Sequence, residues 1–258
     1  MKKTTLANTK KFLAIVFCLI LSNVALAQNV TVSGALAGNG SYPDLNSAFA
    51  AINGGAQTNA NITVDIIGNT TETVSAVLNA GAWTSLVIKP SGGSARTITG
   101  AIAGHLIDLN GADNVSINGL NTGGNALTIS NTNTGTVSTI RFIAAASNNT
   151  VINCTVLGSS TDITTGTILF STATAGGNSN NMISTCDVGP AGTNLPANGI
   201  ISIGTASNDN ANNTIQNCNI GISMIGFAAA SPFTLADTGN DIGGTSAATG
   251  NSIINFGG

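Results

Sequence analysis

The chain has 258 residues, of which 42% are apolar and 7% charged, and its 7 Lys and Arg against 10 Asp and Glu give a net charge of −3. This apolar content excludes a disordered chain, because it supplies enough side chains for a core. Four of the cations lie in the first 11 residues, and the three that remain are too few to neutralise a run of phosphates, which excludes nucleic acid and anionic membrane surfaces as partners.

Residues 1–27 have the three parts of a secretory signal peptide: four lysines, an apolar run over 12–21, and Ala25-Leu26-Ala27 before the expected cleavage point. The apolar run is shorter than the roughly 20 residues that a membrane-spanning helix needs. An acylated lipoprotein would use Cys18, but Phe17 stands where that signal requires a small residue. We therefore expect a secreted or outer-surface protein with no membrane-spanning segment after signal removal.

The segment 28–55 predicts an N-terminal strand, VTVSGAL, followed by a short capping helix within 42–55. Leu45, Ala48, Phe49 and Ile52 recur at the spacing of one helical face, and Gly54 is a typical stop. A short amphipathic helix of this kind can cover the open end of a stack of coils, where unpaired strand edges and apolar side chains would otherwise meet water.

From residue 56 to 258 the chain alternates short β-rich runs with Gly, Asn, Ser or Pro clusters, which is typical of a sandwich, a barrel or a β-helix. Within the repeats a second strand precedes each Asn-rich phrase, so each unit has at least two strands and a variable loop. We predict strands at 62–67, 85–89, 96–102, 106–109, 115–120, 140–143, 167–170 and 200–203.

Cys154, Cys186 and Cys218 are each 32 residues apart and lie in variants of one phrase: NTVINCTV, NMISTCDV and NTIQNCNI. A fixed period with the same residues in phase is the signature of a solenoid, which decides in favour of a parallel β-helix. Equivalent positions in successive coils lie about 4.8 Å apart, so the three cysteines should form a buried, reduced ladder. The alternative is one disulfide between neighbours, because the spacing is within disulfide reach.

The asparagines of these phrases predict structural ladders as well. Asn tolerates the left-handed backbone of a corner, and stacked amides can bond along the axis. The alternative is a polar strip that binds sugar hydroxyls. One phase contains Asn149, Asn181, Asn213 and Asn251, and a second contains Asn153, Asn217 and Asn255, with Thr185 in the same position.

These phrases, together with the opening YPDLNSAFAAIN and the runs IDLNGADNVSINGL and DIGGTSAATGNSI, resemble the right-handed parallel β-helix (pectin-lyase-like) repeat proteins. The resemblance extends from Val30 to Gly258 and is strongest to large surface and secreted proteins of Bacteroidetes-type bacteria. It implies a right-handed parallel β-helix, but it does not imply one activity, because this scaffold serves lyases, hydrolases, adhesins and stalks. The chain stops at Gly258 within another copy of the phrase, so we expect an uncapped C-terminal end and a fragment of a longer protein.

If the chain is an enzyme, the resemblance to pectate lyases implicates Arg141 as base, with Asp108 and Asp113 one coil earlier. A plain salt bridge is the alternative. Similar polygalacturonases carry Asp-Asp, Gly-His-Gly and Arg-x-Lys motifs, but this sequence has no Asp-Asp, no Arg-x-Lys, and only Gly104-His105-Leu106.

Other candidate sites are weaker. His105 is the sole histidine and reads as an edge residue. The segment with Asp237 and Asp241 faintly resembles the start of a calcium-binding loop, and calcium is the only cofactor that the sequence suggests. The bidentate Glu expected further along such a loop is missing. Thr97-Ile98-Thr99 has the Thr-x-Thr form of ice-binding rows, yet no such row repeats in phase.

Three aromatic residues in loop-like stretches, Trp83, Phe227 and Phe233, could stack on sugar rings if exposed. Downstream of the signal peptide the chain has one His, one Glu and three cations. These are too few to assemble most hydrolytic or eliminative active sites. We therefore expect an exported, non-catalytic surface protein, adhesin-like or binding extracellular polysaccharide or matrix. The alternative is a polysaccharide lyase or glycoside hydrolase.

Overall fold

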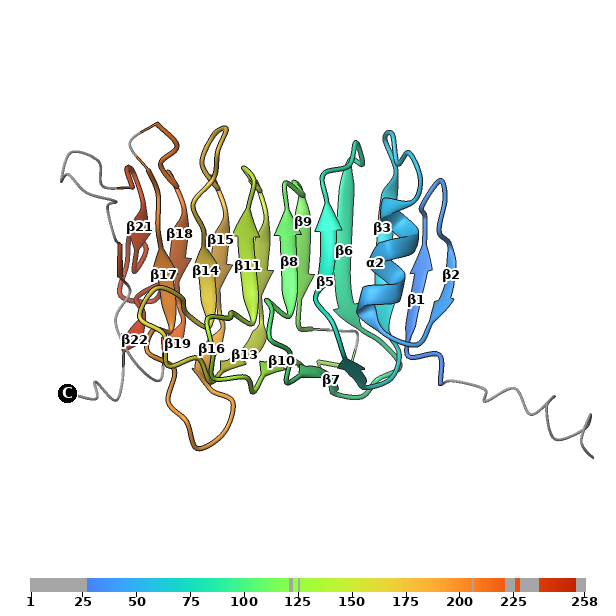
Figure 1. The fold of residues 1–258 in the computed structure, drawn as a ribbon, viewed down its shortest axis with the longest axis horizontal. Coiled ribbons are helices and arrows are strands. Elements are labelled where there is room, and N and C mark those ends of the chain that lie inside the picture. The colour runs from blue at the N-terminus through green and yellow to red at the C-terminus, as the bar shows by residue number, and fades with distance from the viewer. Residues whose placement is uncertain are drawn as a thin grey trace, which may run out of the picture.

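The computed structural model describes residues 27–120, 123–124, 126–205, 207–220, 226–227 and 237–253. They form an elongated parallel β-solenoid whose coils stack along the long axis of the molecule (Figure 1). The prediction of an all-β parallel solenoid with one short helix is confirmed. Of the predicted signal peptide only Ala27 is described, and Cys18, Phe233 and Asn255 lie outside the described residues. No helix in the described ranges is both long enough and apolar enough to cross a membrane.

Each coil contributes one strand to each of three sheets, named A, B and C in chain order. Sheet A begins with an antiparallel hairpin and consists of β2 (Gly40–Tyr42), β1 (Val30–Ser33), β3 (Asn61–Ile66), β6 (Ser85–Pro90), β9 (Val115–Asn118), β12 (Thr150–Ile152), β15 (Met182–Ser184), β18 (Thr214–Gln216) and β21 (Asp241–Ile242). Sheet B consists of β4 (Thr70–Glu72), β7 (Arg96–Gly100), β10 (Leu127–Asn131), β13 (Cys154–Gly158), β16 (Asp187–Pro190), β19 (Asn219–Ile220) and β22 (Ser252–Ile253). Sheet C consists of β5 (Ala76–Asn79), β8 (Ile107–Asn110), β11 (Ile140–Ile143), β14 (Ile168–Phe170), β17 (Ile200–Ser202) and β20 (Gly226–Phe227).

The core lies inside the coils because alternate residues of most strands are apolar and point inward. One such row runs along sheet A, where each side chain pairs in register with its equivalent in the next coil and all are almost fully buried: Ile88, Ile117, Val151, Ile183 and Ile215. Burial of each side chain contributes about 1.5 to 3 kcal/mol. In sheet C the rings of Phe142 and Phe170 stack with centroids 4.7 Å apart.

The N-terminal end is closed by helix α2 (Leu45–Asn53), which packs against β5. The helical face predicted from the sequence is the buried face. Asp44 is the N-cap and accepts a hydrogen bond from the Ser47 N–H. Glu72, from the first coil, accepts two more, from the Leu45 N–H at 3.0 Å and the Asn46 N–H at 2.9 Å. The only Glu of the chain therefore fixes the cap to the solenoid.

The corner between sheets A and B divides the repeated phrase into two strands. Asn153, Thr185 and Asn217 occupy it with φ of 58°, 53° and 50°, the left-handed conformation that Asn tolerates well. Their side chains bond between coils: Asn153 Nδ2 donates to Asn118 Oδ1 at 3.1 Å, and Asn217 Nδ2 donates to Thr185 Oγ1 at 3.2 Å. Each corner turns the chain so that the cysteine belongs to the next sheet.

Cys154, Cys186 and Cys218 stack in successive coils at the start of sheet B, and all three are buried free thiols. Each Sγ donates to the carbonyl two residues earlier at 3.2 Å. The side-chain interaction with Cys154, and to a smaller extent burial, raises the pKa of Cys186 to about 12. None of these three described cysteines forms a disulfide, so the ladder consists of free thiols.

A second buried ladder runs through Asn149, Asn181 and Asn213. The Asn181 Oδ1 accepts the Asn149 N–H at 2.9 Å, and the Asn213 Oδ1 accepts the Asn181 N–H at 2.9 Å. The assignment of Asn251 to this ladder is wrong. The Asn213 N–H donates to Asn240 Oδ1, whereas Asn251 Oδ1 accepts the Cys218 N–H on sheet B. The true equivalent, Asn240, follows Asn213 by only 27 residues, whereas Asn251 was assigned from the likeness of its phrase NSIINFG and belongs to the next corner.

Candidate functional site

Arg141 and Asp108 lie side by side on the outer face of sheet C, in paired positions of β11 and β8. The guanidinium binds the carboxylate in bidentate geometry, with Nε–Oδ1 at 2.9 Å and Nη2–Oδ2 at 2.6 Å. The side chains are 23% and 8% exposed. Two parallel charge-assisted bonds satisfy the carboxylate and hold the arginine in place.

Asp113 does not join this pair. Its Oδ1 accepts the Ser147 N–H at 2.7 Å at the corner that follows β8. Burial raises the pKa of Asp113, and the Ser147 N–H partly offsets that shift. Of the three residues implicated by resemblance to lyases, the structure therefore brings two together and uses the third to hold a corner.

His105 is a neighbour of the Arg141–Asp108 pair that the sequence did not indicate. Its Nδ1 accepts the Ser138 N–H at 3.1 Å. Burial, and secondarily the charge of Arg141, lower its pKa to about 4, against the opposing effect of Asp108. The imidazole is therefore neutral near pH 7, with Nδ1 held as an acceptor.

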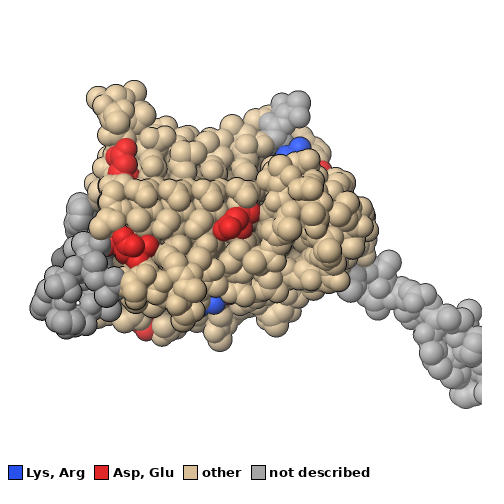
Figure 2. Space-filling view, turned by 90° about the horizontal axis from the view of Figure 1, so that it is seen from above, with Lys and Arg blue, Asp and Glu red and all other residues tan. Residues whose placement is uncertain are grey.

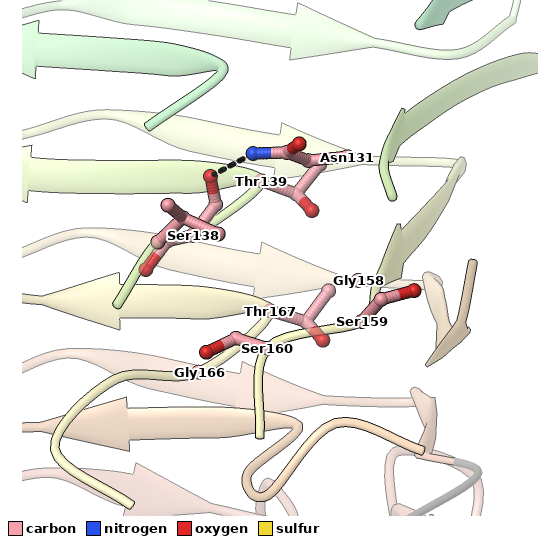
Figure 3. Close-up of a pocket in the computed structure, with 9 residues that line it drawn as sticks. Asn131, Ser138, Thr139, Gly158, Ser159, Ser160, Gly166 and Thr167 are labelled. Atoms are coloured by element: carbon pink, nitrogen blue, oxygen red, sulfur yellow. Dashed lines mark hydrogen bonds between the residues drawn. The ribbon is translucent and has the colours of Figure 1, made fainter. Parts of the chain in front are cut away.

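A narrow crevice lined with hydroxyl groups lies where sheet B turns into sheet C (Figure 3). Most of its polar groups already have partners: Asn131 Nδ2 donates to Ser138 O, the Ser138 and Thr165 hydroxyls are 2.6 Å apart, and Thr139 Oγ1 donates to Leu157 O at 2.6 Å. Thr167 Oγ1 is buried there and has no hydrogen-bond partner among the residues that the structure describes. The interior has no room for a water molecule, so a sugar ring cannot enter it.

The two carboxylates considered for calcium bind protein groups instead. Asp237 Oδ1 accepts the Asn210 N–H at 2.9 Å, and its Oδ2 accepts the Ser202 hydroxyl. Asp241 Oδ1 accepts the Gly244 N–H at 3.0 Å. In the described ranges, no group of three His, Cys, Asp or Glu side chains gathers as metal ligands would. These contacts fit the end of a ladder better than an oxygen-rich calcium loop.

Trp83 is not available to stack on a ligand, because it is 5% exposed and its Nε1 donates to Asp113 O at 2.6 Å. Phe227 is in β20, but its side chain is outside what the structure describes.

The outer face of sheet B carries the feature that the sequence analysis missed. Thr97, Thr128 and Thr155 pair in register across β7, β10 and β13, and a second column contains Thr71, Thr99 and Ser130. Only Thr97 and Thr99 form a Thr-x-Thr rung, because the equivalent pairs in the next two coils are Thr128 with Ser130 and Thr155 with Leu157. The expectation that no Thr-x-Thr row repeats in phase therefore holds, and what repeats is a single threonine column. These coils differ in length, so the residues align across the sheet but not at a constant sequence interval.

The hydroxyls of Thr97, Thr128 and Thr155 form no hydrogen bond with the described residues, and these side chains are half-buried at the surface. Both columns end in the first coil at Asn69 and Thr71. There they reach an open cleft whose lining also includes Asn29, Pro43 and Asp44, together with Ala27 of the predicted signal peptide.

Comparison with protein-family profiles, with curated proteins and with solved structures gives no match for this chain. The assignment of function therefore rests on its own residues.

Proposed function

We propose that this chain is an exported, non-catalytic β-solenoid of the pectin-lyase-like, Bacteroidetes surface-protein kind, which binds extracellular polysaccharide or matrix. Its N-terminal 27 residues would direct export, and its stacked coils would project a binding face from the cell surface. The scarcity of charged groups supports an uncharged ligand, and Figure 2 shows one face of the molecule on which charged residues are isolated among uncharged ones.

The main support for a non-catalytic role is that the ionisable side chains are already bonded to other groups of the protein. Arg141 and Asp108 neutralise each other, Glu72 binds the N-terminus of α2, and Asp237 accepts the Asn210 N–H of the preceding coil. An acid–base site needs groups that can exchange protons with a substrate, and each of these is engaged in holding the fold.

A polysaccharide lyase or hydrolase is the second candidate, and one observation favours it. Arg141 and Asp108 share the outer face of sheet C, and His105 lies close enough for their charges to affect its pKa, so a substrate could approach the half-buried guanidinium beside a histidine. Catalysis would require Arg141 to leave its bidentate partner.

The test is a screen of the purified protein on neutral and acidic polysaccharides, with retention measured alongside release of reducing or unsaturated chain ends. We expect retention without new ends. If new ends appear, Arg141→Gln should abolish them under the second candidate. Lys89→Gln, which removes a cation 3.8 Å from Asp65 on sheet A, is the matched control and should not. New ends that depend on Arg141 would contradict the proposal.

A further inference from the structure

We infer that the outer face of sheet B binds an extended, uncharged polysaccharide that lies along the solenoid axis, with its end in the cleft beside Asn69. This inference rests on the proposed function and specifies its ligand class and its face. The face consists of four rungs, one per coil: Asn69 and Thr71, Thr97 and Thr99, Thr128 and Ser130, Thr155 and Leu157. In the second column Ser130 is buried and the Thr99 hydroxyl donates to Thr70 O, so the first column supplies the hydroxyls for a ligand.

The spacing of this array suits a polymer of sugar rings. Successive rungs are about 4.8 Å apart and the two columns about 6.6 Å apart, as parallel strands dictate. The rung spacing is close to the length of one pyranose ring in an extended chain. Threonine presents a hydroxyl and a methyl group from the same carbon, so one side chain can bond a sugar hydroxyl and contact a ring C–H group.

The hydroxyls of the first column are also free to bind. At the nearby corner, the hydroxyls of Ser138, Thr139 and Thr165 all bond within the protein. Those of Thr97, Thr128 and Thr155 have no partner in the described part of the chain. The open cleft at the end of the columns is continuous with them, since Asn69 and Thr71 of the first rung line it.

The distribution of charged residues around the rungs favours a neutral polymer as the ligand. The four rungs contain no charged side chain, and acidic residues stand at both ends: Asp44 lines the cleft, and Asp187 follows Thr155 in the next coil. An anionic polymer would be repelled at both ends. A protein partner would need aromatic or arginine anchors, which the rungs lack.

The test compares two triple variants in depletion assays on insoluble cellulose, β-1,3-glucan and chitin, with polygalacturonate as the anionic polymer. Thr97→Val, Thr128→Val and Thr155→Val together remove the hydroxyls and keep the β-branched shape. The matched control is Thr63→Val, Thr150→Val and Thr214→Val, three half-buried outward threonines of sheet A that are not adjacent in register. Thr128→Val alone is the reserve if the triple variant does not fold.

We expect wild type and the sheet A variant to bind at least one neutral polymer equally, and the sheet B variant to bind it at least about tenfold more weakly. Equal binding by all three proteins would overturn the assignment of the face and leave the proposed function standing. No binding by wild type would overturn both proposals. Binding to polygalacturonate alone, or arrest of ice growth without polysaccharide binding, would overturn the ligand class.

Discussion

The corners of the solenoid and the outer face of sheet B are built from the same residue types, Ser, Thr and Asn, but use them differently. At the corners, Asn181 is 1% exposed and its amide bonds to both neighbouring coils. On sheet B, Thr128 is half-buried at the surface and its hydroxyl has no partner among the described residues. The difference teaches that polar composition alone does not identify a binding surface in this fold, because burial and bond saturation decide whether a polar group is structural.

The largest effect should come from breaking a buried ladder. Asn181→Ala removes an acceptor for the Asn149 N–H and a donor to Ala146 O, and it leaves both buried groups unsatisfied. We expect a loss of about 2 to 4 kcal/mol in the free energy of unfolding, measured by denaturant titration. Asn219→Ala, at an exposed position of sheet B, should change stability by less than about 0.5 kcal/mol. Equal losses in the two variants would remove the distinction between the regions.

The next effect concerns the cap. Glu72→Ala removes the acceptor of two main-chain N–H groups at the N-terminus of α2, so we expect a loss of about 2 kcal/mol. Hydrogen exchange should accelerate most at Leu45 and Asn46. Asp44→Ala, which removes only the local N-cap bond to Ser47, should cost about 1 kcal/mol. Unchanged exchange at Leu45 in the Glu72 variant would show that the helix is held by packing alone.

The cysteine ladder should be chemically silent in the folded protein. Its thiols are buried and the pKa of Cys186 is raised to about 12, so the reactive thiolate is suppressed. We expect no labelling of Cys154, Cys186 or Cys218 by a thiol reagent until denaturant unfolds the chain, and Cys186→Ala should cost about 1 kcal/mol. Rapid labelling of the native protein would place the ladder at the surface.

His105 predicts a smaller, pH-dependent effect. Its folded pKa, about 4, lies below the ordinary value of 6.5, so the unfolded chain binds more protons between these values. The stability it confers is complete above pH 6.5 and is lost as the pH falls toward 4. His105→Asn can still accept the Ser138 N–H, but it does not titrate. In this variant the free energy of unfolding should therefore depend less on pH between 6.5 and 4 than in wild type. Parallel curves for wild type and variant would contradict the burial of this ring.

The sequence predicted the solenoid, the cap and the cysteine ladder because all three rest on local regularity: a fixed period near Cys154 and a helical spacing near Phe49. It missed β4, β5 and β10. In β4 the inward residues, Thr70 and Glu72, are polar and break the apolar alternation. β5 and β10 do bury apolar residues, so polar inward residues do not explain their omission. It misplaced Asn251 and overlooked the Thr97 column for one reason. Register between coils depends on loop lengths, which vary outside the three cysteine coils, so alignment across a sheet is not visible as a period in the sequence.

One paired measurement tests the central contrast most directly: the unfolding free energy and the neutral-polysaccharide retention of Asn181→Ala and Thr128→Val, each relative to wild type. We predict that Asn181→Ala loses about 2 to 4 kcal/mol of stability and retains full binding per folded molecule. Thr128→Val should keep its stability within about 0.5 kcal/mol and bind more weakly. Loss of stability and binding together in both variants, or no loss of binding in Thr128→Val, would contradict the separation of structural corners from a binding face.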